Sequence, residues 1–270
     1  MAKFGKLSIL LAAILVIQAC ATVPLTGRRQ LSLVDEAALQ QEAVLAYQQF
    51  LGDPATTVVR NSSQAQMVQR VGTRVANAVT KFLNENGYAD EYNFDWEFSL
   101  IDSDQINAWC MPGGKVAVYT GILPVTQNEA GLATVMGHEI AHAIAKHSSE
   151  RMSQAIAAEL GGVAVGVATA EQSNTTRAVI NTAYGLGGQL ALMSYSRNQE
   201  MESDRLGLVF MAMAGYNPSE AVSFWERMAA AKSGSGGAPP EFLSTHPSDA
   251  RRIMNIQKLL PEAMTYYNQQ

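Results

Sequence analysis

The chain shows the hydrophobic periodicities of both helices and strands. Over residues 62–86, apolar side chains recur every three or four residues, which predicts a helix with one buried face. Residues 92–100, YNFDWEFSL, alternate between apolar and polar positions and predict a strand; residues 115–120, KVAVYT, predict a second one. Further helices are predicted over residues 35–51, 176–213 and 218–231, from Asn128 onwards, and from Pro247 towards the C-terminus.

These elements predict a single α+β domain over residues 35–270, dominated by helices and containing a small sheet. The composition, with 47% hydrophobic and 16% charged residues, allows a sizeable buried core. A net charge of -5 gives no basic surface for nucleic acid, which is therefore not expected as a partner. Residues 232–240, KSGSGGAPP, predict a flexible loop.

Residues 1–19 have the pattern of a bacterial lipoprotein signal peptide. The lysine-containing start MAKFGK precedes the apolar run LSILLAAILVI, and the following IQAC resembles a lipobox in which Cys20 is lipidated. The apolar run is shorter than the roughly 20 residues that a membrane span needs, although an uncleaved anchor helix is the alternative. Residues 20–34 are then expected to form an extended tether. Ala21, where aspartate would retain the protein at the inner membrane, favours by resemblance the outer membrane, facing the periplasm.

Two other segments carry structural expectations. Residues 155–170, AIAAELGGVAVGVATA, predict a closely packed internal helix or loop, because sixteen residues that include Glu159 are short for a membrane span. A hairpin that touches the membrane is the alternative. Cys110 has no cysteine partner if Cys20 carries lipid, so it is expected to be a small buried residue.

The stretch VMGHEIAHAIAKH, residues 135–147, carries the order H-E-x-x-H. On a helix, His138 and His142 share a face and can bind one metal ion. Glu139 lies about 100° around the helix, where it can take a proton from an attacking water without binding the metal. The alternative is a surface helix with unrelated histidines. His147 has no supporting pattern and is expected on the surface.

A third metal ligand is expected from the acidic stretch EMESD. Glu200 and Asp204 are four residues apart and share a helical face, whereas Glu202 points elsewhere. We therefore expect Glu200 to bind the metal and Asp204 to orient a ligating histidine. Glu202 as the ligand, or an acidic helix that is merely solvated, are the alternatives.

Four motifs together resemble the zinc metallopeptidases that include HtpX and the CAAX prenyl proteases, and most closely the bacterial lipoprotein members of that family. They are HEIAH, SRNQEMESDRLG, NAWCMPGGKVAVYTGIL and STHPSDARR, and the resemblance covers residues 62–260. It implies a zincin-like (gluzincin) domain with one zinc ion per chain, held by His138, His142 and Glu200.

The same resemblance implies roles for further residues. His246 is expected either as a reversible fourth ligand or as a transition-state donor, with Arg252 helping to stabilise the oxyanion and Arg251 as the alternative arginine. An edge strand is expected to hold an extended peptide by strand addition, an interior strand being the alternative. The residues of this expected edge strand are Gly114, Lys115, Val116, Ala117 and Val118.

The expected function is that of a membrane-anchored zinc endopeptidase that cleaves misfolded or unassembled envelope proteins for protein quality control. The outer-membrane assembly machinery is an expected partner. The alternative is a chaperone-like or assembly-factor lipoprotein with a closed, largely inactive metal site. The presence of Glu139 favours catalysis, because a purely structural site needs no general base. Prenyl-protein processing is disfavoured, since that branch has several long apolar spans and this chain has none after residue 20.

Overall fold

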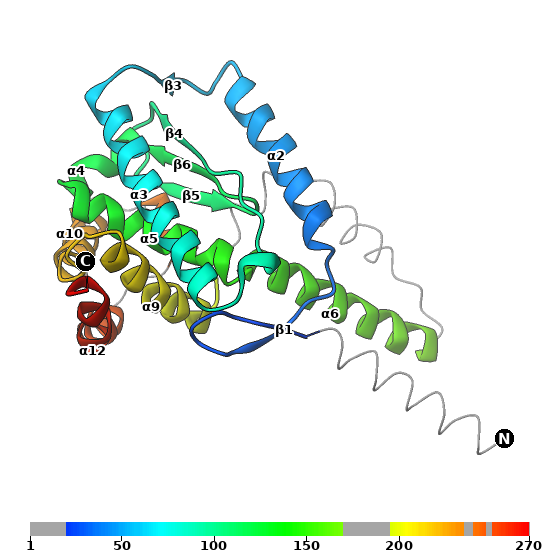
Figure 1. Ribbon diagram of the computed structural model, residues 1–270. Coiled ribbons are helices and arrows are strands. Elements are labelled where there is room, and N and C mark those ends of the chain that lie inside the picture. Colours follow the sequence, from blue (N-terminus) through cyan, green and yellow to red (C-terminus); the bar gives the residue numbers. More distant parts are fainter. Residues whose placement is uncertain (1–19, 170–194, 235–239, 247–249, 270) are drawn as a thin grey trace.

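The computed structural model describes residues 20–169, 195–234, 240–246 and 250–269, and helices dominate this part (Figure 1). The predicted signal peptide, the predicted helix before Tyr195 and most of the 232–240 loop lie outside the described residues. The helices of the described part are α2 Glu36–Gly52, α3 Ser63–Glu85, α4 Leu123–Thr126, α5 Glu129–Ile144, α6 His147–Thr169, α9 Arg197–Met213, α10 Glu220–Gly234, α11 Glu241–Thr245 and α12 Ala250–Tyr267.

Most of the predicted helices are confirmed, and side-chain caps explain where three of them begin. The side chains of Asp35, Ser62 and Asn128 accept hydrogen bonds from backbone N–H groups in the first turns of α2, α3 and α5. Val71 and Val75 of α3 are fully buried, as the helical period predicts.

A four-stranded sheet has the order β3-β4-β6-β5, with the middle pair parallel and both outer pairs antiparallel. The strands are β3 Val58–Val59, β4 Glu97–Ile101, β5 Ala108–Met111 and β6 Lys115–Tyr119. Helices α3 and α5 pack on one face around Phe98 and Val116, and α2 covers the other face, where Tyr47 contacts Trp109. Cys110 is a buried free thiol on β5, as expected.

The strand predicted over residues 92–100 is shorter in the structure. Pairing with β6 starts only at Glu97, opposite Lys115, next to Gly113 and Gly114, whose positive φ angles of 83° and 88° form the turn that leads into β6. The alternating aromatic rings stack in a row that runs from Tyr92 through Phe94 and Trp96 to Phe98 of β4.

The expectation of an edge strand at residues 114–118 is wrong. Strand β6 lies between β4 and β5, so its backbone is paired on both sides. The Lys115 side chain is buried and its Nζ lies 2.8 Å from Oδ2 of Asp95, so it is not available to a substrate. The strand at this edge of the described sheet is β5, which lies against α5. Strand order depends on long-range pairing that a local pattern does not contain.

The segment expected to be a tether is extended, but it is folded onto the domain. Strands β1 Cys20–Thr22 and β2 Arg29–Leu31 form an antiparallel hairpin, which we call the N-terminal hairpin (residues 20–31). Val23 is buried, and the side-chain amide of Gln30 donates a 2.7 Å hydrogen bond to the carbonyl of Ala145 at the end of α5. The hairpin therefore packs where α5 gives way to α6.

Helix α6 contains residues 155–169, so nearly all of the alanine- and glycine-rich segment is helical. It leads from the end of α5 away from the sheet (Figure 1). At its start, Ile156 packs against the buried residues Val34, Leu39 and Met152, and the side chains from residue 159 onwards are not described. None of the described helices is long and apolar enough to cross a membrane.

Candidate metal centre

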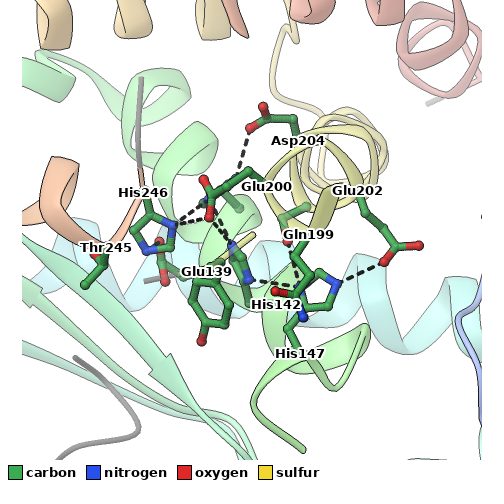
Figure 2. Close-up of polar contacts among 12 residues, drawn as sticks. Glu139, His142, His147, Gln199, Glu200, Glu202, Asp204, Thr245 and His246 are labelled. Carbon is green, nitrogen blue, oxygen red and sulfur yellow. Dashed lines mark hydrogen bonds and ion pairs between the residues drawn. The ribbon is translucent and has the colours of Figure 1, made fainter. Parts of the chain in front are cut away.

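Helices α5 and α9 pack side by side and supply most of the candidate site. His138, Glu139 and His142 project from α5. Helix α9 starts with a capping box in which Ser196 and Gln199 satisfy each other's backbone N–H groups, and this start places Glu200 in the first turn. Figure 2 shows Glu139 and His142 from α5 and Glu200 from α9 converging on one place.

Four buried side chains form a cluster whose ligand atoms all lie within 4.8 Å of one another: His138, His142, Glu200 and His246. Nε2 of His138 is 3.1 Å from Nε2 of His142 and 3.2 Å from Nδ1 of His246. An oxygen of Glu200 lies 2.9 Å from Nδ1 of His246 and 3.4 Å from Nε2 of His142. The structure thus brings together all four residues expected to act as ligands.

The spacing of these atoms fits a tetrahedral metal ion. A tetrahedron with metal–ligand bonds of about 2.0–2.1 Å has ligand–ligand edges of about 3.3–3.4 Å. The separations of His138 Nε2 from the nitrogens of His142 and His246, and of Glu200 Oε1 from the same two nitrogens, run from 2.9 to 3.4 Å. Burial holds the pKa of His142 well below its ordinary value, so the imidazole is neutral and able to bind a metal. Three imidazole nitrogens and one carboxylate oxygen are a donor set that suits zinc.

Glu139 lies beside the cluster without joining it. Among the described residues, its buried Oε1 has no hydrogen-bond partner; Nε2 of His246 is 3.3 Å away but is not aligned to donate. Burial is the main cause that raises the pKa of Glu139 to about 7. A carboxylate with an unused oxygen and a pKa near neutrality can accept and return a proton.

Asp204 and Arg252 lie behind His138. Oδ1 of Asp204 is 3.0 Å from Nδ1 of His138, as expected for a group that orients a ligating histidine. Arg252 donates two hydrogen bonds to Asp204 and one to Glu200, and its guanidinium lies 3.5 Å from the centre of the Trp225 ring. Arg251 is exposed, whereas Arg252 is buried and contacts the site, so Arg252 is the arginine of the site.

The donors of Arg252 point at Glu200, one of the candidate ligands, and at Asp204 behind His138. These contacts position the side chains of the site, and the oxyanion role expected for Arg252 stays a prediction. Burial opposes ionisation of Asp204, but the charge of Arg252 and a hydrogen bond to His138 outweigh it and lower the pKa of the Asp204 carboxyl. The arginine therefore keeps Asp204 charged inside the protein.

The surface position expected for His147 is wrong, because its side chain is fully buried next to the cluster. Its Nδ1 lies 2.9 Å from Nδ1 of His142, and its Nε2 lies 2.9 Å from Oε2 of Glu202 (Figure 2). Glu202 thus points away from the ligand atoms, as its helical position predicts. Helical periodicity misses His147, since Lys146 adopts a positive φ of 52° and separates α5 from α6.

His246 reaches the cluster from the end of the short helix α11. Tyr195 holds this region to the start of α9: its backbone N–H donates a 3.2 Å hydrogen bond to the carbonyl of Thr245. The Tyr195 ring also stacks on His142, with ring centres 3.9 Å apart. Nothing in the sequence pattern indicated this contact. With His246 in place, the four side chains would fill the four positions of a tetrahedral metal site, which closes it.

Comparison with known proteins decides the family. Residues 62–260 match peptidase family M48. The chain belongs to peptidase family M48. The ligand-bearing helices α5 and α9 and the residue His246 all lie within the part that matches family M48, whereas the N-terminal hairpin lies outside it.

Several proteins resemble this family M48 chain over most of its length. The mitochondrial metalloendopeptidase OMA1 of Schizosaccharomyces pombe is 32% identical over 241 residues, which cover 89% of this chain and 66% of that protein. The beta-barrel assembly-enhancing protease of Escherichia coli is 30% identical over 187 residues, which cover 66% of this chain and 38% of that protein. The chain therefore spans less than two thirds of the length of these relatives.

Proposed function

We propose that this chain is a zinc-dependent endopeptidase that hydrolyses peptide bonds of misfolded or unassembled envelope proteins. The observation that carries the proposal is the buried Glu139 oxygen, which has no hydrogen-bond partner among the described residues, beside a cluster of metal-ligand type. A site built only for structure needs no such base. The names of the relatives, a metalloendopeptidase and an assembly-enhancing protease, support the same reaction class.

In the proposed mechanism, His138, His142 and Glu200 hold one zinc ion. Bound zinc supplies Lewis acidity, which lowers the pKa of water and polarises a peptide carbonyl. Glu139 takes the proton of the attacking water on Oε1 and delivers it to the leaving amine. Asp204 fixes the ring of His138 through Nδ1, so that Nε2 faces the ion.

The closed arrangement of His246 is proposed to be a resting state. Its imidazole lies between the ligand cluster and Glu139, where the substrate carbonyl and the water must be. Activity therefore requires His246 to leave, and the reversible-ligand role fits this geometry better than that of a donor in the transition state. The closed site also favours the alternative function, an assembly factor whose metal site stays inactive, which the experiment below separates.

The substrate is proposed to pair with β5 instead of β6. Asn107 accepts a backbone hydrogen bond from Tyr119 on β6, so in this antiparallel pair the backbone groups of Ala108 and Cys110 face the outer edge. The N–H of Ala108 donates to Oδ1 of Asn107, a hydrogen bond that the substrate would have to replace. Strand addition at such an edge binds any extended backbone with little demand on sequence. This property suits an enzyme that recognises unfolded chains.

The zincin-like (gluzincin) fold, the place of the chain among the bacterial lipoprotein members of the family, and lipidation at Cys20 are part of this proposal. They put the enzyme in the bacterial cell envelope, on the outer membrane facing the periplasm. The likeness to an assembly-enhancing protease supports the choice of envelope proteins as substrates and of the assembly machinery as a partner.

Cleavage of casein tests the activity. The chain is assayed with zinc, with chelator, and as Glu139→Gln, whose zinc content is measured alongside. We expect cleavage only in the first case, with Glu139→Gln still binding zinc. Equal activity in all three would exclude the peptidase. Zinc binding without cleavage by either the unaltered chain or His246→Ala would favour the inactive assembly factor.

A further inference from the structure

His142 differs from His138 in what holds its second ring nitrogen. Asp204 faces Nδ1 of His138 directly, whereas Nδ1 of His142 faces another histidine, His147, at 2.9 Å. With Nε2 of His142 turned to the ligand cluster, its Nδ1 carries the proton and donates to Nδ1 of His147. His147 must then carry its own proton on Nε2.

The next contact agrees with this proton arrangement. Nε2 of His147 is 2.9 Å from Oε2 of Glu202, a pure acceptor when ionised. Both side chains are shielded from solvent: that of His147 is fully buried, and that of Glu202 is 5% exposed. A defined hydrogen-bond direction therefore runs from His142 through His147 to Glu202 (Figure 2).

Glu202 is held in turn by the N-terminal hairpin. Nε of Arg28 donates a 2.8 Å hydrogen bond to Oε2 of Glu202, and the hydroxyl of Thr26 donates to Oε1. Arg28 also binds Glu150 of α6 through Nη1 at 2.7 Å. The guanidinium thus bridges two carboxylates from two helices, α6 and α9, a task that suits its fork of donors.

Loss of this bridge has a predictable effect on the site. A buried carboxylate that loses donors is costly, and Glu202 would relieve the cost by moving. This movement removes the acceptor that fixes His147, and with it the ring direction of His142. Outer groups of this kind typically contribute about 10–100-fold to metal affinity.

We propose that Arg28 and Thr26 are positioning residues for the metal ligand His142, acting through Glu202 and His147. The N-terminal hairpin is then a structural part of the metal centre and not a passive connection to the membrane. This inference rests on the metal site proposed above and goes beyond its ligands and its base.

Zinc affinity of point variants tests the inference without any assay of peptidase activity. Dissociation constants are measured on the full mature chain by competition with a chromophoric chelator. We expect Arg28→Ala to bind zinc about 10–100-fold more weakly, and Thr26→Val, which removes one hydroxyl, to change affinity less in the same direction. The matched control is Arg29→Ala, which removes the same charge at the exposed neighbouring position and should stay within about twofold.

Absorption of the cobalt-loaded proteins adds a readout of ligand geometry. We expect the cobalt bands of Arg28→Ala and Thr26→Val to shift, and those of Arg29→Ala to match the unaltered chain. If both hairpin variants bind zinc like Arg29→Ala and keep its cobalt spectrum, the inference is wrong. Should Arg28→Ala fail to fold, Thr26→Val decides alone. A chain that binds no zinc even unaltered would overturn the metal site itself, which is a different result.

Discussion

Gly137 of α5 and Gly207 of α9 bring the two helices together backbone to backbone. A Cβ atom on Gly207 would lie 2.9 Å from the carbonyl carbon of Gly137 and from the backbone nitrogen of His138, and a Cβ on Gly137 would lie 2.9 Å from the Gly207 carbonyl oxygen. Such distances are shorter than real contacts allow. This approach lets Glu200 of one helix reach the histidines of the other.

We expect Gly207→Ala to separate α5 from α9. The substitution should cost about 1–3 kcal/mol of folding free energy through overpacking and should weaken zinc binding, because Glu200 moves away from His138. Urea unfolding and chelator competition measure the two effects. Gly52→Ala at the end of α2 is the control, since its Cβ meets nothing within 4 Å. Similar behaviour of the two variants would contradict the close-approach argument.

Arg252 should matter for stability even in the presence of chelator. Arg252→Leu leaves Asp204 and Glu200 buried beside one another without their cation, and we expect a loss of about 3–5 kcal/mol in urea unfolding. Lys258→Leu, at an exposed position of the same helix, should change stability by no more than about 0.5 kcal/mol. An Arg252→Leu protein with unchanged stability and zinc affinity but low activity would instead support the oxyanion role.

Glu139 should destabilise the chelator-treated protein at neutral and alkaline pH. Folding raises the pKa of its carboxyl from 4.5 to about 7, which corresponds to about 3 kcal/mol. The sign follows from linkage: the cost is absent below pH 4.5, grows as the pH rises between these two values, and is complete above about 7. Glu139→Gln should therefore unfold at a higher temperature than the unaltered chain at pH 8, with the difference vanishing near pH 4. An equal difference at both pH values would rule out this account.

Removal of His246 should open the site. We expect His246→Ala to cleave casein about tenfold faster, the factor expected if the open state is populated about 10% of the time, and to bind zinc more weakly because one ligand is gone. Ser244→Ala, at an exposed position of the same short helix, should leave both properties unchanged. Unchanged cleavage by His246→Ala would show that His246 neither blocks nor assists the reaction.

Sequence periodicity predicted the helices well because their determinants are local. The caps at Ser62 and Asn128 and the apolar face of α3 follow directly from neighbouring residues. The helical period also predicts that Glu200 and Asp204 share one face of α9 and that Glu202 lies on another, because α9 is one uninterrupted helix.

Features that depend on chain reversals or distant partners were not predictable in this way. On a continuous helix, His142 and His147 would lie about 140° apart, but the left-handed Lys146 brings their Nδ1 atoms within 2.9 Å. Likewise, β6 became interior only through pairing with β5, which precedes it in the chain. Val23 is buried because the hairpin packs onto the domain. The residues that flank Val23 show no hydrophobic periodicity that would predict its burial.

The N-terminal hairpin would also limit how far the proposed enzyme can reach. Cys20, the residue that we propose to carry the lipid, pairs with Leu31 within the hairpin. A domain of this size has a radius of gyration of about 18 Å, so a lipid on Cys20 would hold the metal centre within a few such lengths of the bilayer. Peptide bonds would then be cut at the membrane surface, and more distant substrates would have to come to it.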